Sequence, residues 1–387
     1  MDWQEFRRLY PVTLKLAYLN NASMGPLPLP VRAALDSHLD RWQKEDLGGS
    51  IGIDFSERLR CKIARFISAS PEEIAFTSGV TGGLFRAASL VRPAAGENIV
   101  LPANEFPSAV YPWRRYEREG AQVRFAGPPR GPVTENHLME ACDEATRAIC
   151  ASLVSFADGT RLDLETLSAF CRSRGIALVI DAMQAAGALK VDVSKAPVDF
   201  LAFAAVKWIP APVGAGALYV RHGWEERAEG RWLGWRSVRR NELRELLRYD
   251  LQPCPGARRL DGGSPAFLSH VGMEAALDLF ETVGTARIEQ RILGLARLVA
   301  QLLLEEGFER VWPQTDQRRS GIVVGELRNP FAAGEAAGAM GHVVEGMAED
   351  GVIVAERNGR IRISAHAFND ESDLERLREA FHRLPLK

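Results

Sequence analysis

Residues 148–180 decide the fold, and they read AICASLVSFADGTRLDLETLSAFCRSRGIALVI. An apolar run at 148–154 is followed by a helical pattern at 164–174, which closes at Gly175, and by a second apolar run at 176–180. A strand, a helix and a strand in this order predict a right-handed βαβ unit with parallel strands. In sheets of this kind ligands bind beyond the carboxyl ends of the strands.

Five more short apolar runs lie around this unit, and helical patterns separate most of them. They occupy residues 74–76, 99–101, 123–125, 200–203 and 217–220. Strands that alternate with helices in this way predict an α/β domain on a mostly parallel sheet.

The alternation of apolar runs and helical patterns ends near residue 251. Segments rich in proline and glycine at 252–256 and 262–265 precede a long helical stretch at 267–304. Strand candidates at 321–326 and 361–363 and an amphipathic helix at 373–382 follow. We expect a large domain at 18–255, a smaller α+β domain at 256–387, and a segment at 1–17 that packs with the small domain.

Composition excludes several classes of function. The 387 residues are 46% hydrophobic and carry a formal net charge of -2, which gives no overall attraction to nucleic acid or to an anionic membrane. No apolar run approaches the roughly 18 residues of a membrane span, and the first residues do not form a secretion signal. We therefore expect a cytoplasmic protein with a small-molecule substrate.

The five cysteines are scattered without a CxxC pair, which argues against a disulfide framework and against a zinc site. Residues 231–250 hold six arginines with Trp232 and Trp235 among them, a pattern that nucleic-acid-binding segments also show. Because Glu242 and Glu245 dilute this charge, we interpret the segment as a solvated helix and dimer edge.

Two polar residues end apolar runs at the predicted ligand-binding edge. Asp181 follows the run at 176–180, with Gln184 three residues later, and the run at 200–206 leads into Lys207. Desolvation lowers the pKa of a lysine, and the neutral amine can attack a carbonyl to form an imine. The alternative is an ordinary surface lysine at the end of a strand.

A third candidate is the segment 76–83, which reads FTSGVTGG and leads into a helical pattern at 84–90. Backbone N–H groups at such a turn can hold a phosphate, although serine and threonine before a helix also act as simple caps. No GxGxxG motif follows a strand, so the sequence gives no support to a nicotinamide-linked dehydrogenase.

Taken in order, these segments resemble the class V aminotransferase family. This family comprises fold-type I pyridoxal-phosphate enzymes and includes cysteine desulfurases, selenocysteine lyases, isopenicillin N epimerases and kynureninases. The resemblance is carried by residues 18–23, 76–83, 105–108, 181–184, 207–208 and 361–369. It implies pyridoxal phosphate as cofactor, a mostly parallel seven-stranded sheet with a smaller C-terminal α+β domain, and a homodimer whose active sites lie at the interface.

The resemblance also implies roles for single residues. Lys207 is expected to form the Schiff base and then to act as the base at the α-carbon, and Asp181 to pair with the pyridinium nitrogen. Gln184 is expected to hydrogen-bond the phenolic oxygen of the cofactor, and Phe106 to stack on its ring. Further expected contacts are Val80 and Thr81 with the phosphate, Gly263 and Ser264 with the phosphate bound to the neighbouring subunit, and Arg362 and Asn21 with the substrate.

Several positions depart from the family pattern. Many members carry a serine and a histidine where this chain has Ala204 and Val206, and an asparagine where it has Phe156. No cysteine follows Cys254, and the short link at 352–360 leaves no room for the loop that carries a persulfide-forming cysteine, which argues against desulfuration by persulfide transfer.

We therefore expect a pyridoxal-phosphate enzyme that acts at the α-carbon of a small amino acid. Transamination is the predicted reaction, and β-elimination by a lyase, of a C–S bond or a related one, and epimerisation are the alternatives. A protein that binds the cofactor but has lost catalysis is a further alternative, motivated by the three departures.

Overall fold

The computed structural model describes residues 1–47, 53–228, 234–239, 247, 249, 251–311, 315–327 and 336–383. Most of the arginine-rich segment at 231–250 therefore lies outside the described residues.

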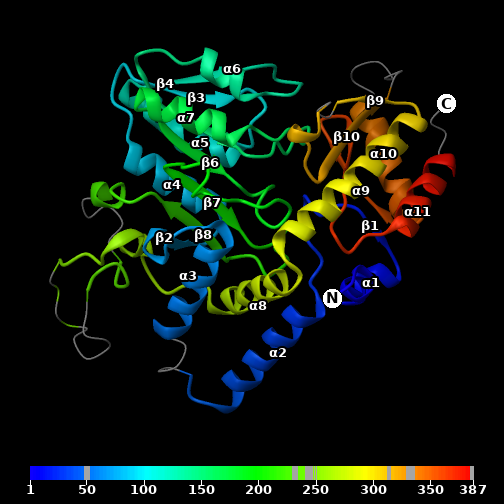
Figure 1. Ribbon diagram of the computed structural model, residues 1–387, viewed down its shortest axis with the longest axis horizontal. Coiled ribbons are helices and arrows are strands. Elements are labelled where there is room, and N and C mark those ends of the chain that lie inside the picture. Colours follow the sequence, from blue (N-terminus) through cyan, green and yellow to red (C-terminus); the bar gives the residue numbers. More distant parts are fainter. Residues whose placement is uncertain are drawn as a thin grey trace.

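Seven strands form the central sheet, in the order β2–β8–β7–β6–β5–β3–β4 (Figure 1). They are β2 Ile74–Thr77, β3 Asn98–Pro102, β4 Gln122–Ala126, β5 Thr146–Ser152, β6 Ala177–Asp181, β7 Phe200–Ala204 and β8 Gly216–Val220. Strand β8 is antiparallel to both of its neighbours, and the other pairs are parallel. Each of the seven apolar runs forms one of these strands, so the predicted sheet is confirmed.

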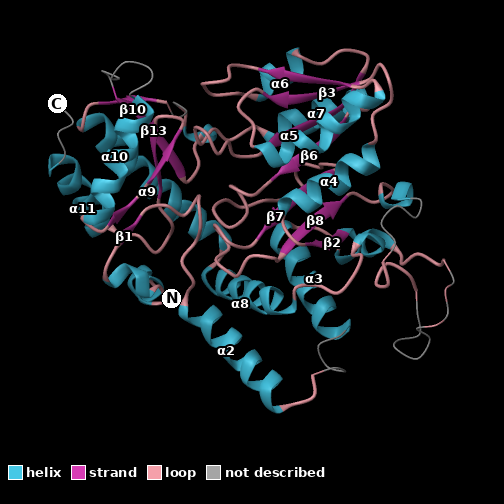
Figure 2. Ribbon diagram, turned by 180° about the vertical axis from the view of Figure 1, so that it is seen from behind, coloured by secondary structure: helices cyan, strands magenta, loops and turns pink. Residues whose placement is uncertain are grey.

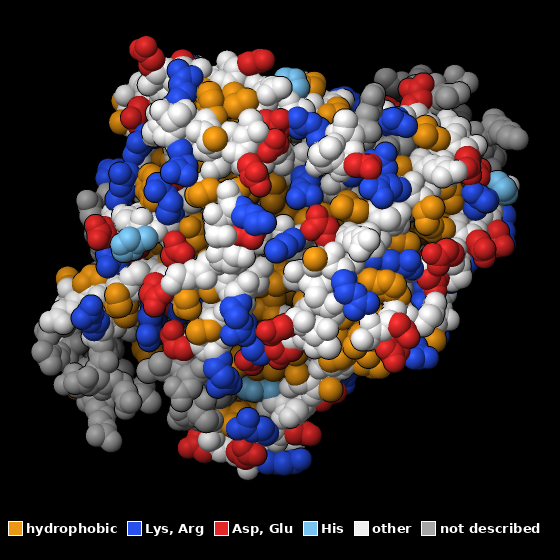
Figure 3. Space-filling model, viewed as in Figure 1, with side chains coloured by type: hydrophobic (Ala, Val, Ile, Leu, Met, Phe, Trp, Pro, Cys, Tyr) orange, Lys and Arg blue, Asp and Glu red, His pale blue; other side chains and the backbone are white. Residues whose placement is uncertain are grey.

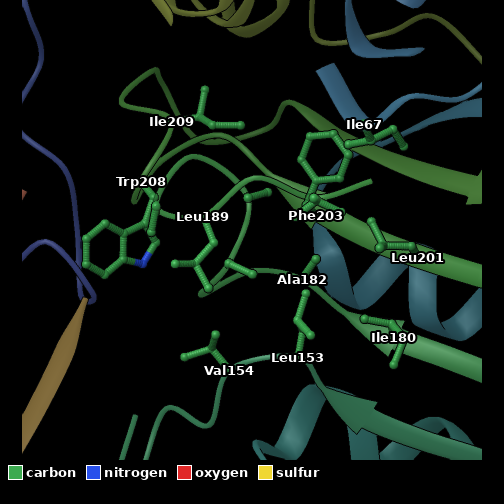
Figure 4. Packing of buried hydrophobic residues seen from close by; sticks show 14 of the residues in the cluster. Ile67, Leu153, Val154, Ile180, Ala182, Leu189, Leu201, Phe203, Trp208 and Ile209 are labelled. Atoms are coloured by element: carbon green, nitrogen blue, oxygen red, sulfur yellow. The ribbon is translucent and has the colours of Figure 1, made fainter. Parts of the chain in front are cut away.

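Helices cover both faces of this sheet. On one face lie α4 Val80–Val91 and α5 Pro107–Arg114, and on the other lie α3 Ile53–Ile67, α7 Leu164–Arg174 and α8 Phe267–Val283. Two further helices are α2 Leu29–Lys44, which packs along α8, and α6 Glu135–Glu140. Because side chains alternate along a strand, Phe200 and Ala202 enter one core, and Leu201 and Phe203 enter the other. Figure 4 shows Leu201 and Phe203 in the second core.

A second, smaller group of elements lies beside the sheet (Figure 2). Its antiparallel sheet has the order β12–β13–β10–β9, and β1 pairs with β11 in a parallel ribbon. The strands are β1 Ala17–Tyr18, β9 Phe308–Arg310, β10 Ile322–Leu327, β11 Val352–Ile353, β12 Ala355–Arg357 and β13 Arg360–Ser364. The helices are α9 Thr285–Glu305, α10 Ala336–Glu349 and α11 Glu371–Arg383. This arrangement is the predicted smaller α+β part.

Two predicted helical stretches differ from the structure by more than two residues at an end or by a break. The stretch predicted as one helix at 267–304 is broken into α8 and α9 by Gly284, whose φ of 92° places it in the left-handed region. Helix α4 begins at Val80 instead of residue 84, directly after Gly79.

The N-terminal helix α1 Trp3–Arg8 contacts the C-terminal part of the chain, where Arg7 binds Asp373 at 2.6 Å. Helix α8, which follows residue 256, packs on α2 and α3 of the larger part. The division into domains at residues 17 and 255 stays a prediction.

Charges of both signs are interspersed over the face shown in Figure 3. Among the described residues, no helix is long and apolar enough to cross a membrane.

Candidate active site

The candidate residues gather at one edge of the seven-stranded sheet, where strands β2, β6 and β7 end. A cavity of about 210 Å³ opens there. Its lining includes five residues predicted from the sequence, which are Val80, Phe106, Asp181, Gln184 and Lys207. The sheet brings these residues together from segments that lie up to 127 positions apart, between 80 and 207.

Lys207 follows β7 and lines this cavity. Burial lowers the pKa of its ammonium group to about 8, although the carboxylate of Asp181 opposes the shift. Two guanidinium groups, Arg362 and Arg357, add to the lowering because like charges repel. About a tenth of Lys207 is therefore the neutral, nucleophilic amine at pH 7, far more than for an ordinary lysine.

The backbone around Lys207 is strained and tightly held. Val206 has a φ of 141°, which a β-branched residue rarely adopts. The N–H of Gly25 donates to the carbonyl of Val206 at 2.7 Å, and His366 Nε2 lies 3.2 Å from the carbonyl oxygen of Trp208. Contacts from two distant segments thus hold the lysine in place.

Asp181 ends β6 and is only 4% exposed. Its Oδ1 accepts a hydrogen bond from Met183 N at 2.8 Å. Burial raises the pKa of Asp181 to about 6, while that hydrogen bond and Lys207 oppose the shift. A cationic partner such as a pyridinium N–H would favour its ionised form.

Gln184 lies at the cavity wall with its amide already engaged. Its Oε1 accepts from Trp208 Nε1 at 2.9 Å, and its Nε2 donates to the carbonyl of Ala22 at 3.0 Å. The amide keeps one further N–H, which is the group that the predicted contact with a phenolic oxygen requires.

Phe106 is 42% exposed and faces the lysine, with Lys207 Nζ 5.9 Å from the centre of its ring. Phe156 packs edge-on against Phe106 at 5.1 Å between ring centres. Both rings line the cavity, as do the departures Ala204 and Val206. The wall is therefore apolar on the side of these residues.

The turn after β2, where the phosphate contact is predicted, lies at the cavity. Ser78, Gly79 and Val80 line the cavity, and α4 starts at Val80, so its N-terminal N–H groups and helix dipole favour a bound anion. Thr81 is not part of the lining, and its hydroxyl lies 2.8 Å from Ser108 Oγ at the start of α5.

Arg362 is 2% exposed and has uncharged partners. Its Nη2 donates to Ser23 Oγ at 2.7 Å and its Nη1 to the carbonyl of Phe156 at 3.2 Å. Its Nε has no partner among the described residues. Burial, and then Arg357, lower the pKa of Arg362 to about 9. A buried guanidinium held in this way is suited to a carboxylate ligand.

Two residues near the cavity were given no role by the sequence reasoning. Arg357 Nη2 donates to the same Ser23 Oγ at 3.1 Å, so two guanidinium groups share one hydroxyl. Glu105 accepts hydrogen bonds from Ser152 N and Ser152 Oγ, each at 2.6 Å. A loop glutamate or a strand arginine is usually solvated, so neither residue type points to a site by itself. The one signal in the sequence was that Glu105 directly precedes Phe106.

Besides Thr81, four predicted residues are not part of the cavity lining: Asn21, Gly263, Ser264 and Arg362. Asn21 is 1% exposed, and its side-chain amide has no hydrogen-bond partner among the described residues. Gly263 and Ser264 do not line the cavity of their own chain. Their predicted contribution to a neighbouring subunit stays a prediction.

The arrangement fits pyridoxal phosphate. The helix N-terminus suits the phosphate, the carboxylate of Asp181 suits the ring nitrogen, the ring of Phe106 suits a stacked face, and Lys207 suits the aldehyde. The buried Arg362 supplies a site for the carboxylate of an amino acid.

Comparison with known proteins agrees with this fit. The chain is 27% identical over 400 residues to a probable cysteine desulfurase of Methanothermobacter thermautotrophicus, covering 99% of this chain and 98% of that protein. It is 28% identical over 411 residues to an isopenicillin N epimerase of Amycolatopsis lactamdurans, covering 99% and 98%. The solved complex of the cystine C-S lyase C-DES with its reaction product cysteine persulfide has the same fold, with a TM-score of 0.84 at 22% identity over 97% of this chain and 99% of that one.

The family model for class-V aminotransferases matches residues 18–377. The chain therefore belongs to the class-V aminotransferase family of pyridoxal-phosphate-dependent enzymes.

Proposed function

We propose that this enzyme is a lyase that breaks the Cβ–S bond of a disulfide amino acid such as cystine. The observation that carries the proposal is the pair of guanidinium groups on Ser23 Oγ, with Arg362 Nη2 at 2.7 Å and Arg357 Nη2 at 3.1 Å. Both groups act electrostatically on Lys207. One arginine suffices for an α-carboxylate, so the second is available for another anionic group.

Cystine carries two carboxylates, one on each side of its disulfide. Arg362 would bind the carboxylate at the reacting α-carbon, and Arg357 the distal one. Lyases and desulfurases for sulfur amino acids are found among the similar proteins, which supports a lyase over the transamination expected from the sequence. The described residues that line the cavity include no cysteine, and the proposed route uses no protein thiol.

The reaction requires one base in the cavity. Lys207 Nζ would remove the α-proton of the substrate, and the Cβ–S bond would then break with its electron pair left on sulfur. When bound, pyridoxal phosphate supplies the electron-withdrawing ring that makes the α-carbanion accessible. The products are a persulfide, which takes up a proton, and aminoacrylate, which water converts to pyruvate and ammonia.

Epimerisation would need a second acid or base on the opposite face of the substrate. Among the described residues that line the cavity, two have ionisable side chains, Lys207 and Asp181, and Asp181 is the proposed partner of the ring nitrogen. The aromatic rings of Phe106 and Phe156 provide no proton donor. This favours elimination over epimerisation.

The test is to incubate the cofactor-loaded protein with cystine and to measure pyruvate, ammonia and persulfide sulfur. We expect the three products in equal amounts, and none with Lys207→Ala. Conversion of the cofactor to pyridoxamine phosphate without pyruvate would instead identify a transaminase. Exchange of the α-hydrogen with loss of optical activity would identify an epimerase.

A further inference from the structure

A larger cavity lies at the edge of the seven-stranded sheet opposite to Lys207, and we call it the distal cavity. Its volume is about 410 Å³, against about 210 Å³ for the candidate active site, and the two share no lining residue. It lies where β6 begins at Ala177, where Asp199 precedes β7, and where Arg221 follows β8. The proposed reaction uses none of its residues.

The lining of the distal cavity carries an excess of positive charge. Four guanidinium groups against one carboxylate give its described residues a net charge of +3 when His222 is neutral. The arginines are Arg147, Arg172, Arg221 and Arg227, and the carboxylate is that of Asp199. The thiol of Cys171 in the same wall adds no negative charge, because burial raises its pKa.

The single carboxylate of the lining pairs with one of these arginines. Arg221 Nε donates to Asp199 Oδ1 at 2.8 Å, and the N–H of Leu178 donates to Asp199 Oδ2, also at 2.8 Å. Outside the lining, Glu225 accepts from the N–H of Gly223 at 2.7 Å and lies 3.2 Å from His222 Nδ1. Within the described part of the chain, the other three arginines have no carboxylate partner. Their charge is therefore available to a bound anion.

Asp199 also fixes an aromatic part of the wall. It is 7% exposed, and its Oδ1 accepts from Trp224 Nε1 at 2.6 Å. The indole meets the ring of Phe200 edge-on, with 5.0 Å between ring centres. The guanidinium of Arg227 lies over the same indole, with Cζ 4.2 Å from the ring centre. A stacked guanidinium keeps its N–H donors in its own plane, so Arg227 is held ready to bind an anion at its edge.

One of the three arginines has a second use. Arg172 lies in the last turn of α7, where a positive charge offsets the helix dipole. Arg174 lies in the same turn and is not part of the lining. The dipole gives no account of Arg147, which is the second residue of strand β5.

We propose that the distal cavity binds the diphosphate group of a small ligand. A phosphate monoester carries about 1.5 to 2 negative charges near neutral pH, so two linked phosphates match three unpaired guanidinium groups better than one phosphate does. Guanidinium groups bind phosphate oxygens through pairs of N–H donors. Free diphosphate and a nucleoside diphosphate both present this group, and the cavity has the volume of a small-molecule site. The inference does not depend on the proposed lyase reaction.

Calorimetry on the cofactor-loaded protein tests this inference. Borohydride first fixes the cofactor on Lys207, so that the phosphate-binding turn before α4 is filled. We expect sodium diphosphate to bind at one site per chain, and orthophosphate to bind at least about tenfold more weakly. Absence of diphosphate binding, or equal affinity for the two anions, overturns the proposal. Tighter binding of adenosine diphosphate than of diphosphate assigns the site to a nucleotide, and weaker binding assigns it to the free anion.

Two arginines of α7 provide a matched pair of variants. Arg172→Gln and Arg174→Gln each remove one positive charge from the last turn of the same helix, but only Arg172 lines the cavity. Arg172→Gln should weaken diphosphate binding at least about tenfold, and Arg174→Gln less than about twofold, because charges outside the site are screened by salt. Arg147→Gln should act as Arg172→Gln does. An equal loss in the two α7 variants would show a general attraction to positive charge and would overturn the proposal.

Arginine modification gives a readout that needs no variant. Phenylglyoxal reacts with accessible guanidinium groups, and mass spectrometry reports the extent of reaction at each arginine. We expect diphosphate to protect Arg147, Arg172 and Arg227 of the cofactor-loaded wild type, and to leave Arg174 as reactive as before. Protection confined to Arg357 would place the diphosphate in the candidate active site and would overturn the proposal.

Discussion

The N–H of Gly25 donates to the carbonyl of Val206 at 2.7 Å, and this contact joins the N-terminal segment to the residue before Lys207. The approach is close because Gly25 has no side chain. A Cβ atom at this position would lie 2.1 Å from the carbonyl oxygen of Lys207. The strained φ of Val206, 141°, is thus held by a contact that only glycine allows.

Gly25→Ala should therefore displace the lysine loop. We expect the affinity for pyridoxal phosphate to fall at least about tenfold, since a side chain moved by about 1 Å no longer has the required geometry. The measurement is a titration of the cofactor-free protein followed by absorbance. Gly294→Ala in α9, where an added Cβ meets nothing within 4 Å, is the control and should bind as wild type does. Unchanged affinity in Gly25→Ala would show that the contact does not position Lys207.

Lys207→Ala should abolish the covalent linkage to the cofactor. We expect borohydride to fix the cofactor on the wild-type protein but not on the variant, as seen by absorbance after gel filtration. The fold should persist, because Lys207 contributes to a cavity wall rather than to a core cluster. Cofactor fixed on the variant in equal yield would place the reactive amine on a different residue.

Arg357→Gln should change substrate preference more than turnover. If Arg357 binds the distal carboxylate, its loss raises KM for cystine roughly tenfold or more and leaves KM for S-methylcysteine unchanged, because that substrate has one carboxylate. Steady-state pyruvate formation with both substrates measures the effect. Arg362→Gln is the comparison. It should raise KM for both substrates, because both carry the α-carboxylate that Arg362 is proposed to bind. An equal effect of Arg357→Gln on the two substrates would assign it a structural role.

The apolar runs were sufficient to predict the strands of the sheet, since a strand buried on both faces reads as a continuous apolar run. Asp181 and Lys207 could be placed together because parallel strands end at the same edge. The positions of Glu105 and Arg357 near the cavity could not be predicted in this way. Their hydrogen-bond partners, Ser152 and Ser23, are distant from them in sequence. The break at Gly284 was also missed, because the apolar pattern continues across it.

Cofactor attachment should follow the ionisation of Lys207. With its pKa near 8, about a tenth of the amine is neutral at pH 7, far more than for an ordinary lysine. The rate of reducible attachment to the cofactor-free protein should rise with pH and level off above about 8. Arg357→Gln removes a positive charge that lowers this pKa, so the plateau should move to higher pH. A wild-type rate that still rises at pH 10 would contradict the lowered pKa.

The ion pair between Arg60 and Asp261 should contribute strongly to stability. Arg60 Nη2 lies 2.6 Å from Asp261 Oδ2, the two side chains are 2% and 3% exposed, and Asp261 Oδ1 accepts from Phe76 N at 2.9 Å in β2. Arg60→Ala leaves a buried carboxylate without its cation, which costs about 3 to 5 kcal/mol. The exposed pair of Arg41 and Glu45 gives the control, and Arg41→Ala should cost less than about 1 kcal/mol. Urea unfolding of wild type, Arg60→Ala and Arg41→Ala measures the free energy of unfolding of each protein. An equal loss of stability in the two variants would mean that Asp261 becomes hydrated or protonated when Arg60 is removed.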